Sequence, residues 1–278
     1  MRTSKPVLDV VISTGGRFDM LERCINAIYS TATVPLTITI VDDATDKEKR
    51  SHYLYLFDYD KTKDTHSNVV RINLKRNEKT QGYSVSNNIG AKVGNAPLIV
   101  FMNDDVEVFP DYFEKLVEVM EDKAIGVCGA KLIFPPTSTD RHRPAGKVQH
   151  IGLALDIRAN AVHPLNGWSP TNPKTNFKRS CLAVTGALLA TRRDVFNKVG
   201  GFDPIYGRGY WEDVDLCLKV RALGGKIWMD TSLLAYHYTG ASMEIDPTHG
   251  ADFQKNTLIF RSKWQSTGML RYDSWSYG

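Results

Sequence analysis

The sequence lacks long hydrophobic runs, an apolar leader and closely spaced cysteines. No stretch reaches the 18 or so apolar residues of a membrane span, and the first residues, Met1 to Pro6, are polar rather than the core of a secretory signal. The 4 cysteines lie far apart and form no C-x-x-C pair, so a zinc ribbon or a redox dithiol is not supported. We expect buried, reduced thiols in a cytoplasmic protein.

The chain also has little net charge and no repeated or low-complexity segment. Its 35 Lys and Arg residues nearly balance 31 Asp and Glu, which leaves +4. Apolar residues make up 42% of the 278 residues and charged ones 24%, as in a folded enzyme. Basic residues gather only in short clusters at 75–76, 141–143 and 178–179, which are typical of solvated loops. This distribution permits contact with an anionic partner but does not indicate the continuous basic stripe that is typical of nucleic-acid-binding proteins.

The first half alternates strand and helix patterns. Apolar, β-branched runs predict strands at 8–14, 36–41, 69–74 and 97–102. Helical spacing follows Asp19, where Asp19 and Glu22 have the spacing of a capping box, and it returns at 84–93 and after Pro110. This alternation predicts a mostly parallel sheet with helices on both faces.

The second half is less regular. Strand-like runs occur at 125–134, 148–157 and 182–191, a helix is expected at 213–223, and two short strands at 226–229 and 233–238. The tail after Ser242 is polar with scattered aromatics, including Trp264 and Trp275. A lid, a packed extension and an oligomer contact are all compatible with such a tail.

Polar side chains end three of the first four strands. They are Ser13-Thr14, Asp42-Asp43 and Asn103-Asp104-Asp105. A turn-forming role explains Asp42 well. Two adjacent carboxylates at the end of an apolar strand repel each other, which suggests a nearby hard cation such as Mg²⁺ or Mn²⁺.

A second acidic cluster, Glu212, Asp213 and Asp215, opens the helix expected at 213–223. The helix dipole alone explains acids at this position, while a general base in a cleft is the functional alternative. His237 lies in an apolar run, where a hydrogen-bonded core histidine is the usual outcome. If Asp105 is nearby, His237 and Asp105 together could hold Mn²⁺.

Five segments in series resemble inverting glycosyltransferases of family 2 with the GT-A fold, most closely the rhamnosyltransferase-like members. The segments are VVISTGGR (10–17), TIVDDAT (39–45), the stretch 81–108 containing NNIG and FMNDDV, the stretch 184–203, and YWEDVDLCLKVRALGGKIW (210–228) followed by YHYTGAS (236–242). The resemblance implies a Rossmann-like nucleotide-binding half with a mostly parallel central sheet, joined to an acceptor-binding half. We expect one domain over 1–242, divided near 124 and 125, with 243–278 as a C-terminal extension.

The resemblance also implies roles for individual residues. The residues that would lie beside the donor nucleotide are Ser13, Thr14, Gly16 and Arg17, while Asp43 would bind the base, Asn87 would face the diphosphate and base, and Asp104 would meet the ribose. Asp105 and His237 would hold Mn²⁺ or Mg²⁺. Asp213 would be the general base, with Glu212 beside it in the acceptor site. The chain departs from the family pattern at two points. Ser13-Thr14-Gly15-Gly16 replaces a proline, aromatic and asparagine loop, and Asn103 replaces the first motif aspartate.

The implied partners are a nucleoside-diphosphate sugar and a glycan, lipid-linked or protein acceptor, with a nucleic-acid acceptor left open and a homodimer through the tail also possible. Two other readings remain. A sugar-nucleotide nucleotidyltransferase would need a basic Gly-rich loop after the first strand, of which Gly15-Gly16-Arg17 is a thin version. A non-catalytic nucleotide-sugar or glycan-binding module would lack the base or the metal acid, and both are present in this sequence.

Overall fold

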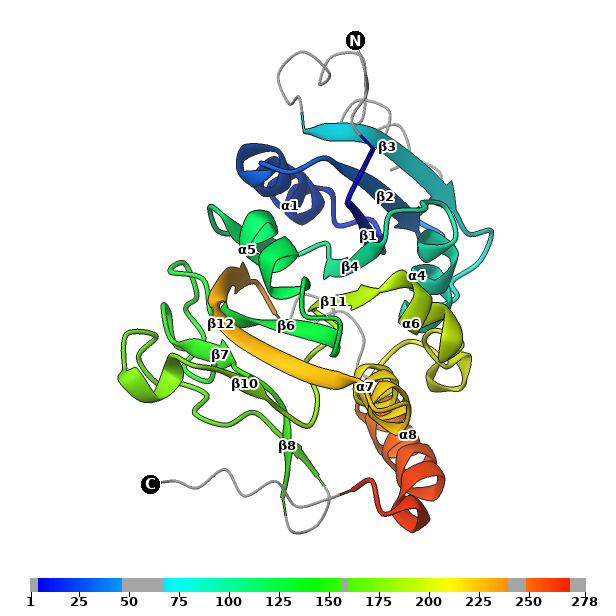
Figure 1. Ribbon diagram of the computed structural model, residues 1–278, viewed down its shortest axis with the longest axis vertical. Helices are drawn as coiled ribbons and strands as arrows, with labels where there is room; N and C mark the ends of the chain where they lie inside the picture. The colour runs from blue at the N-terminus through cyan, green and yellow to red at the C-terminus, as the bar shows by residue number, and fades with distance from the viewer. Residues whose placement is uncertain (1–4, 47–67, 157–159, 240–248, 271–278) are drawn as a thin grey trace.

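A computed structural model describes residues 5–46, 68–156, 160–239 and 249–270. Within these ranges a ten-stranded sheet runs through the molecule, and its main path follows the order β10-β12-β6-β11-β4-β1-β2-β3 (Figure 1). The strands on that path are β10 (Lys178–Ser180), β12 (Lys226–His237), β6 (Ile125–Ile133), β11 (Leu188–Arg192), β4 (Leu98–Asn103), β1 (Leu8–Thr14), β2 (Leu36–Asp42) and β3 (Val69–Arg76). Two short strands join the sheet off the path: β5 (Val106–Val108) pairs with β12, and β7 (Val148–His150) pairs with β6.

The strands of the first half pair in parallel, as the alternating pattern predicts. Ile12 of β1 lies opposite Ile40 of β2 and Met102 of β4, and β2 pairs in parallel with β3. The antiparallel strand β11 separates β4 from β6, and β6 pairs in parallel with β12. The mixed, mostly parallel α/β sheet is therefore confirmed. The carboxyl ends of β1, β2 and β4 meet at one edge.

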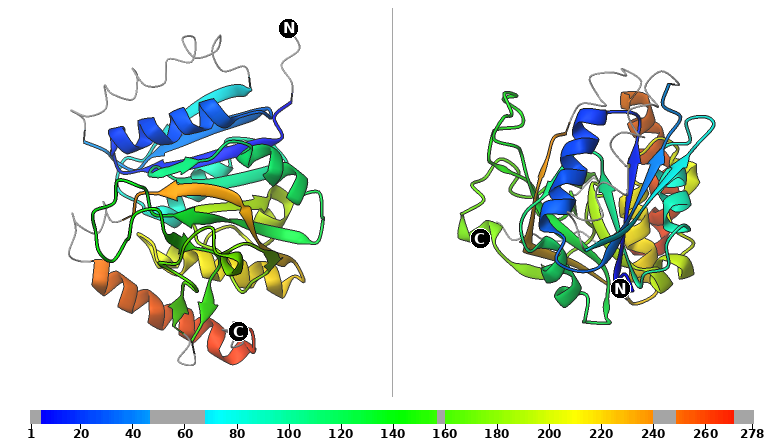
Figure 2. Two further views of the ribbon diagram at one scale, coloured as in Figure 1. Left: turned by 90° about the vertical axis from the view of Figure 1, so that its left-hand side faces the viewer. Right: turned by 90° about the horizontal axis from the view of Figure 1, so that it is seen from above.

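Helices cover both faces of this sheet (Figure 2). Helices α1 (Phe18–Thr31) and α5 (Tyr112–Val119) lie on one face, and α4 (Tyr83–Ala91), α6 (Arg193–Lys198) and α7 (Glu212–Ala222) lie on the other. Successive strand residues point to opposite faces, so Val10 and Ile12 belong to one buried core and Val11 to the second. The first half is thus buried on both sides, which explains its continuous apolar strands.

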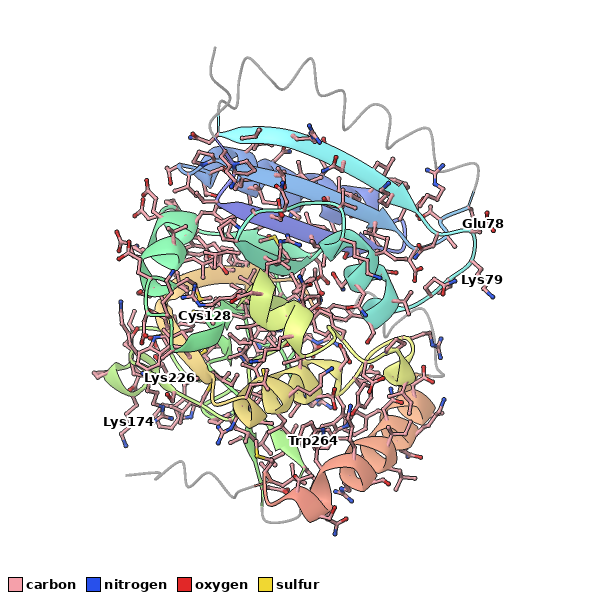
Figure 3. The ribbon with its side chains drawn as sticks, turned by 45° about the vertical axis from the view of Figure 1, so that its right-hand side comes forward. Glu78, Lys79, Cys128, Lys174, Lys226 and Trp264 are labelled. Carbon is pink, nitrogen blue, oxygen red and sulfur yellow. The ribbon has the colours of Figure 1, made fainter. Side chains whose placement is uncertain are left out.

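The tail contributes helix α8 (His249–Trp264), which packs beside α7 in the second core. Phe260 and Trp264 are buried there, and Figure 3 shows Trp264 where α8 lies against α7. The described part of the tail is therefore a packed extension. Trp275 lies outside the described residues, and the domain boundary at 242 stays a prediction.

Several local expectations were wrong. Helix α1 begins at Phe18 with Arg17 as N-cap and no side-chain cap, so Asp19 lies in the first turn and makes no capping box. The two short strands expected at 226–229 and 233–238 form the single strand β12, bulged between Asp230 and Leu234. The bulge follows from Asp230, whose carboxylate accepts hydrogen bonds from the amide and hydroxyl of Ser232.

Two other strand-like runs are interrupted. The run at 148–157 splits into β7 and β8 (Ala154–Leu155) at Gly152. The φ of Gly152 is 110°, a backbone conformation that glycine adopts readily and that differs from an extended strand. Strand β8 pairs with β9 (Ala161–Val162) in a separate small sheet. In the run at 182–191 only β11 is a strand. The amides of Thr185 and Gly186 before it are bound to side chains of His150 and Asp213 instead of a neighbouring strand.

The remaining elements are short 3₁₀ turns: η2 (Pro173–Thr175), η3 (Pro204–Tyr206) and η4 (Gln265–Thr267). All four cysteines are buried and form no disulfide, as expected. Among the described residues, no helix is long and apolar enough to cross a membrane.

Candidate functional site

A cavity of about 770 Å³ opens at the carboxyl edge of the sheet. It is lined by the ends of β1, β2 and β4, the start of α4, the segment before β11, and the start of α7. The sequence-predicted residues that line it are Ser13, Thr14, Arg17, Asp43, Asp104, Glu212, Asp213 and His237. The other three, Gly16, Asn87 and Asp105, lie behind the lining and contact Thr14, Ser13 and His237, respectively. The fold therefore gathers all eleven candidates around one space.

The carboxylates at the end of β4 are buried among cationic and hydroxyl partners. The Arg17 guanidinium donates to Asp104 and, over 3.1 Å, to Asp105 Oδ2. Thr14 Oγ1 donates to Asp104 Oδ2 over 2.7 Å. Burial raises the pKa of Asp104 to about 6, because the charge of Arg17 only partly offsets the desolvation and the repulsion from Asp105. This end of the cavity therefore holds two negative groups that a cation stabilises.

His237 meets Asp105 at this point, as the resemblance implies. His237 Nδ1 lies 2.9 Å from Gln149 Oε1, which can only accept, so Nδ1 donates to Gln149 and the ring turns Nε2 toward Asp105. Gln149 is itself oriented, since its amide nitrogen donates to Thr239 Oγ1 over 2.9 Å. His237 Nε2 lies 3.2 Å from the buried Asp105 Oδ1. An imidazole nitrogen and a carboxylate oxygen that face each other in this way are ligand types that a divalent cation can share.

The residues present fit a metal site whose ligands come partly from substrate and water better than one formed by protein side chains alone. Within the described ranges no group of three or more His, Cys, Asp or Glu side chains could hold a metal ion. Asp105 and His237 would therefore supply two ligands, and the others would come from bound substrate and water, as Mg²⁺ and Mn²⁺ sites commonly allow.

Asp43 anchors the loop that leads into α4. Its two oxygens accept from the side chain of Asn77 and from the amides of Gln81 and Gly82, all within 2.9 Å. Asp42 has the turn-forming role that the sequence suggests, because it accepts from the Thr45 amide and pairs with Arg76. Asp43 also lines the cavity.

Asn87 connects α4 to the end of β1. Its amide nitrogen donates to Ser13 Oγ over 3.2 Å and to the Tyr83 carbonyl over 3.0 Å, whereas its Oδ1 is buried without a partner. Gly16 is required by space, because its φ is 90° and a Cβ there would lie 2.6 Å from Thr45 Cγ2. The turn after β1 can therefore come close to Thr45 only with glycine at this position.

The acidic pair at the start of α7 has a different environment. Asp213 accepts from the Gly186 amide over 2.9 Å and from its neighbour Val214 over 2.8 Å. Glu212 is 6% exposed, and its Oε2 has no partner. In the described part of the chain neither acid has an ion pair. Burial raises the pKa of both carboxyls, and repulsion from Asp213 adds to the shift at Glu212. These acids thus hold a proton more readily than an exposed carboxyl.

Asp215, the third acid of this cluster, is a structural residue. Its Oδ1 accepts from Trp264 Nε1 over 2.8 Å and from Tyr206 over 3.2 Å, and Lys219 and Lys263 neutralise its charge. It is fully buried between α7 and α8 and does not line the cavity. In α7, Asp213 thus lines the cavity, whereas Asp215, two residues further along the helix, packs against α8.

Several site residues have no signal in the sequence pattern. Gln149 lies in a loop-flanked short strand, and only its contact with His237 reveals it. Gly186, Arg208 and Tyr210 line the cavity from segments whose residue spacing indicates no chemistry. The quoted motifs at 184–203 and 210–228 contain Gly186 and Tyr210 but assign them no role, and Arg208 lies between the two motifs.

A sequence model described as glycosyl transferase family 2 matches residues 9–200, more than half of the chain. The chain belongs to glycosyltransferase family 2. This family 2 enzyme carries within the matched range the strand-end residues from Ser13 to Asp105, whereas Glu212, Asp213 and His237 lie beyond it.

Known relatives and structures agree with the assignment. The O-antigen biosynthesis protein RfbC of Myxococcus xanthus is 31% identical over 64% of this chain and 14% of its own length. A structure of GalNAc-T7 with UDP, GalNAc and Mn²⁺ covers 94% of this chain and 49% of its own, with a TM-score of 0.69 and 18% identity. A mannosyltransferase from Pyrobaculum calidifontis in complex with GDP-Man and Mn²⁺ covers 92% and 65%, with a TM-score of 0.61 and 14% identity. These neighbours show the fold to be that of GT-A glycosyltransferases.

The family 2 chain is short beside its relatives. It spans 21% and 14% of the lengths of the first two curated proteins it matches. It is a glycosyltransferase by family, and its substrates and reaction details are matters of proposal.

Proposed function

We propose that the chain transfers a sugar from a nucleoside-diphosphate donor to an acceptor hydroxyl with inversion, using a divalent metal held by Asp105 and His237 and Asp213 as general base. One observation carries the proposal. The candidate metal ligands and an acid without an ion-pair partner lie at the same cavity, on different strands and helices of the sheet edge. A single displacement needs both a stabilised leaving group and a base across the sugar.

The charge of the cavity supports a metal-dependent donor site. The acids that line it are Asp43, Asp46, Asp104, Glu212 and Asp213, whereas its permanent cations are Arg17 and Arg208. A diphosphate would be repelled by this lining unless a cation accompanied it. A divalent metal here would supply electrostatic stabilisation of the departing diphosphate.

Protein groups orient the donor in this proposal. Arg17 and Thr14 hold Asp104, which we assign to the ribose, and Gln149 fixes the ring of His237 so that Nε2 faces Asp105. Asp43 is assigned to the base. Ser13, Gly16 and Asn87 shape the wall beside the nucleotide.

Asp213 is the group best suited to remove the acceptor proton. Its carboxylate is held in place by the Gly186 and Val214 amides, yet each oxygen keeps a lone pair. Its raised pKa makes it a stronger base than an exposed aspartate. Glu212 lies beside it, with a free oxygen for the acceptor or the transferred sugar.

A thermal-shift panel tests the donor half of the proposal. UDP-, GDP-, dTDP- and CMP-linked sugars are each added with Mn²⁺, with Mg²⁺ and with EDTA, the dTDP-deoxyhexose testing the rhamnosyl expectation. Saturation at about 100 times Kd adds roughly 2.7 kcal/mol, or about 5–10 °C for a chain of this size. We expect one nucleotide to give a metal-dependent shift.

The variant D105N should abolish that shift, while D111N, the same change at the exposed N-cap of α5, should keep it. A donor shift that is equal with EDTA, or equal in D105N, would contradict the metal site. Pyrophosphate release from a nucleoside triphosphate would identify a nucleotidyltransferase. Donor binding without transfer to glycan, lipid-linked or protein acceptors would identify a binding module.

A further inference from the structure

Helix α8 lies outside the cavity but holds the segment that leads into the acid pair. This lead segment, Tyr206–Trp211, provides Arg208, Gly209 and Tyr210 to the cavity lining and continues directly into Glu212 and Asp213. No residue of α8 is among the residues that line the cavity. Any effect of α8 on the chemistry therefore passes through the lead segment or α7.

The lead segment adopts a backbone that its residues do not favour. Tyr210 and Trp211 have φ values of 72° and 75°, consecutive left-handed conformations in residues with large side chains. Such a conformation is unfavourable for residues with a Cβ and persists only where the surroundings hold it. The two residues immediately precede the acids, so this backbone sets where the carboxylates point.

Asn256 of α8 supplies the central contact. It is 2% exposed, and its Nδ2 donates to the carbonyls of Tyr206 and Gly209, each over 2.7 Å. A side-chain amide that joins two carbonyls three residues apart fixes the curvature of the backbone between them. The Tyr206 carbonyl also accepts from the Gly209 amide over 3.4 Å, so the turn between these two residues is held by its own backbone and by Asn256.

Other contacts of α8 hold both ends of the lead segment. Asp252 accepts from Arg208 Nε over 2.7 Å, and Thr257 Oγ1 accepts from Trp211 Nε1 over 2.9 Å. The Trp211 ring stacks on Phe260 with centroids 4.2 Å apart. Trp264 binds Asp215 of α7, so α8 is fastened to the same helix that carries the acids. Figure 2 shows α7 and α8 side by side.

We propose that Asn256 is a positioning residue for glycosyl transfer, which places Tyr210, Glu212 and Asp213 by holding the lead segment in its left-handed turn. The inference rests on the proposed roles of Glu212 and Asp213. Within the described residues the Asn256 side chain hydrogen-bonds to the lead segment and to none of the donor residues at the ends of β1 and β4, so its loss leaves those donor contacts in place and should lower turnover without a matching loss of donor affinity. A misplacement of about 1 Å can cost about 100-fold in rate.

The test uses the isosteric variant N256D, which replaces the donating amide by an oxygen that repels both carbonyls. Its matched control is Q254E, the same amide-to-acid change at an exposed position of α8. We expect kcat of N256D to fall 10- to 100-fold with donor KM and the metal-dependent donor shift unchanged, and Q254E to match wild type. Wild-type kcat in a folded N256D would overturn the proposal, as would equal losses of kcat and donor affinity.

A second variant and a second readout cover the other outcomes. T257V removes the hydrogen bond to Trp211 from a half-buried position and should lower kcat several-fold if N256D does not fold; wild-type kcat in T257V would then overturn the proposal. Amide hydrogen exchange over 206–213 should rise in N256D and not in Q254E. If wild type transfers no sugar, the proposed function fails, and unchanged exchange would overturn the positioning role separately.

Discussion

The two acidic pairs of the cavity, Asp104–Asp105 and Glu212–Asp213, differ in what surrounds them. Arg17, Thr14 and His237 face the first pair, whereas Asp213 has only backbone amides and Glu212 Oε2 has no partner. Both pairs consist of neighbouring, mostly buried carboxyls. The pair with cationic neighbours suits charge that stays in place, and the pair without them suits a proton that moves.

This contrast explains how one residue type serves two tasks in one cavity. The end of β4 is enclosed by Thr14 of β1, Arg17 before α1 and His237 of β12, which bring a hydroxyl, one cation and an imidazole. The start of α7 meets the segment before β11, which brings only an amide. The predictions below test whether this difference in partners decides the roles.

The largest expected effect is on turnover. D213N removes the basic oxygen and keeps the shape, so kcat should fall about 10²- to 10⁴-fold, the usual contribution of a general base. The metal-dependent donor shift should stay at its wild-type value, because Asp213 does not contact the first pair. D194N, the same change at an exposed position of α6, is the control. Parallel loss of donor binding and kcat would show that the two pairs do not have separate roles.

A smaller effect is expected from Gln149, which acts only on the first pair. Q149L removes the acceptor that keeps the proton on His237 Nδ1, and outer-shell partners of this kind contribute about 10- to 100-fold in metal affinity. A titration of Mn²⁺ against the donor-dependent thermal shift measures this loss. The saturating-metal kcat should recover most of its value, whereas Q254L should not change the titration. An unchanged Mn²⁺ requirement in Q149L would contradict the assigned orientation of His237.

The smallest effect concerns stability and pH. Burial raises the folded-state pKa of Glu212 above its ordinary value near 4.5. The folded state therefore holds this proton more tightly than the unfolded state, so the stabilisation is complete below the unfolded pKa and is lost as pH rises through the folded pKa. E212Q does not titrate and should be more stable than wild type by about 1 kcal/mol at pH 8, or about 2–4 °C in Tm.

At pH 4 the Tm values of E212Q and wild type should coincide. Thermal unfolding from pH 4 to 9 measures the difference, and D111N, which changes an exposed acid, should show no such divergence. Equal Tm values of E212Q and wild type at every pH would mean that Glu212 has a charge partner, against the contrast between the pairs.

Much of the fold could be predicted from local sequence patterns. Strands β1 and β4 are buried and mainly apolar because both of their faces are covered, and their ends are marked by polar residues such as Ser13 and Asn103. Such features depend on a residue and its near neighbours, so they can be predicted from the sequence. The acidic pairs 104–105 and 212–213 could be identified as candidate site residues from the sequence for the same reason. Their separate roles came from the family resemblance and remain proposals.

One failure was caused by a distant partner for a local group. The strand expected at 182–191 is cut short because amides at 185–186 bind His150 and Asp213. Asp43 and Asp42 are neighbours in sequence, yet one anchors the loop before α4 and the other closes a turn.

The sequence by itself determined the class of fold, the parallel first half and the residue types that end its strands, because periodicity and turn chemistry are short-range. Only the tertiary structure decided which of these side chains meet. His237 reaches Asp105 across 132 residues of chain, Gln149 reaches His237 across 88, and Asn256 reaches Gly209 of the lead segment across 47. Such contacts follow from the packing of the whole sheet, because no local pattern encodes the distance between residues on different elements.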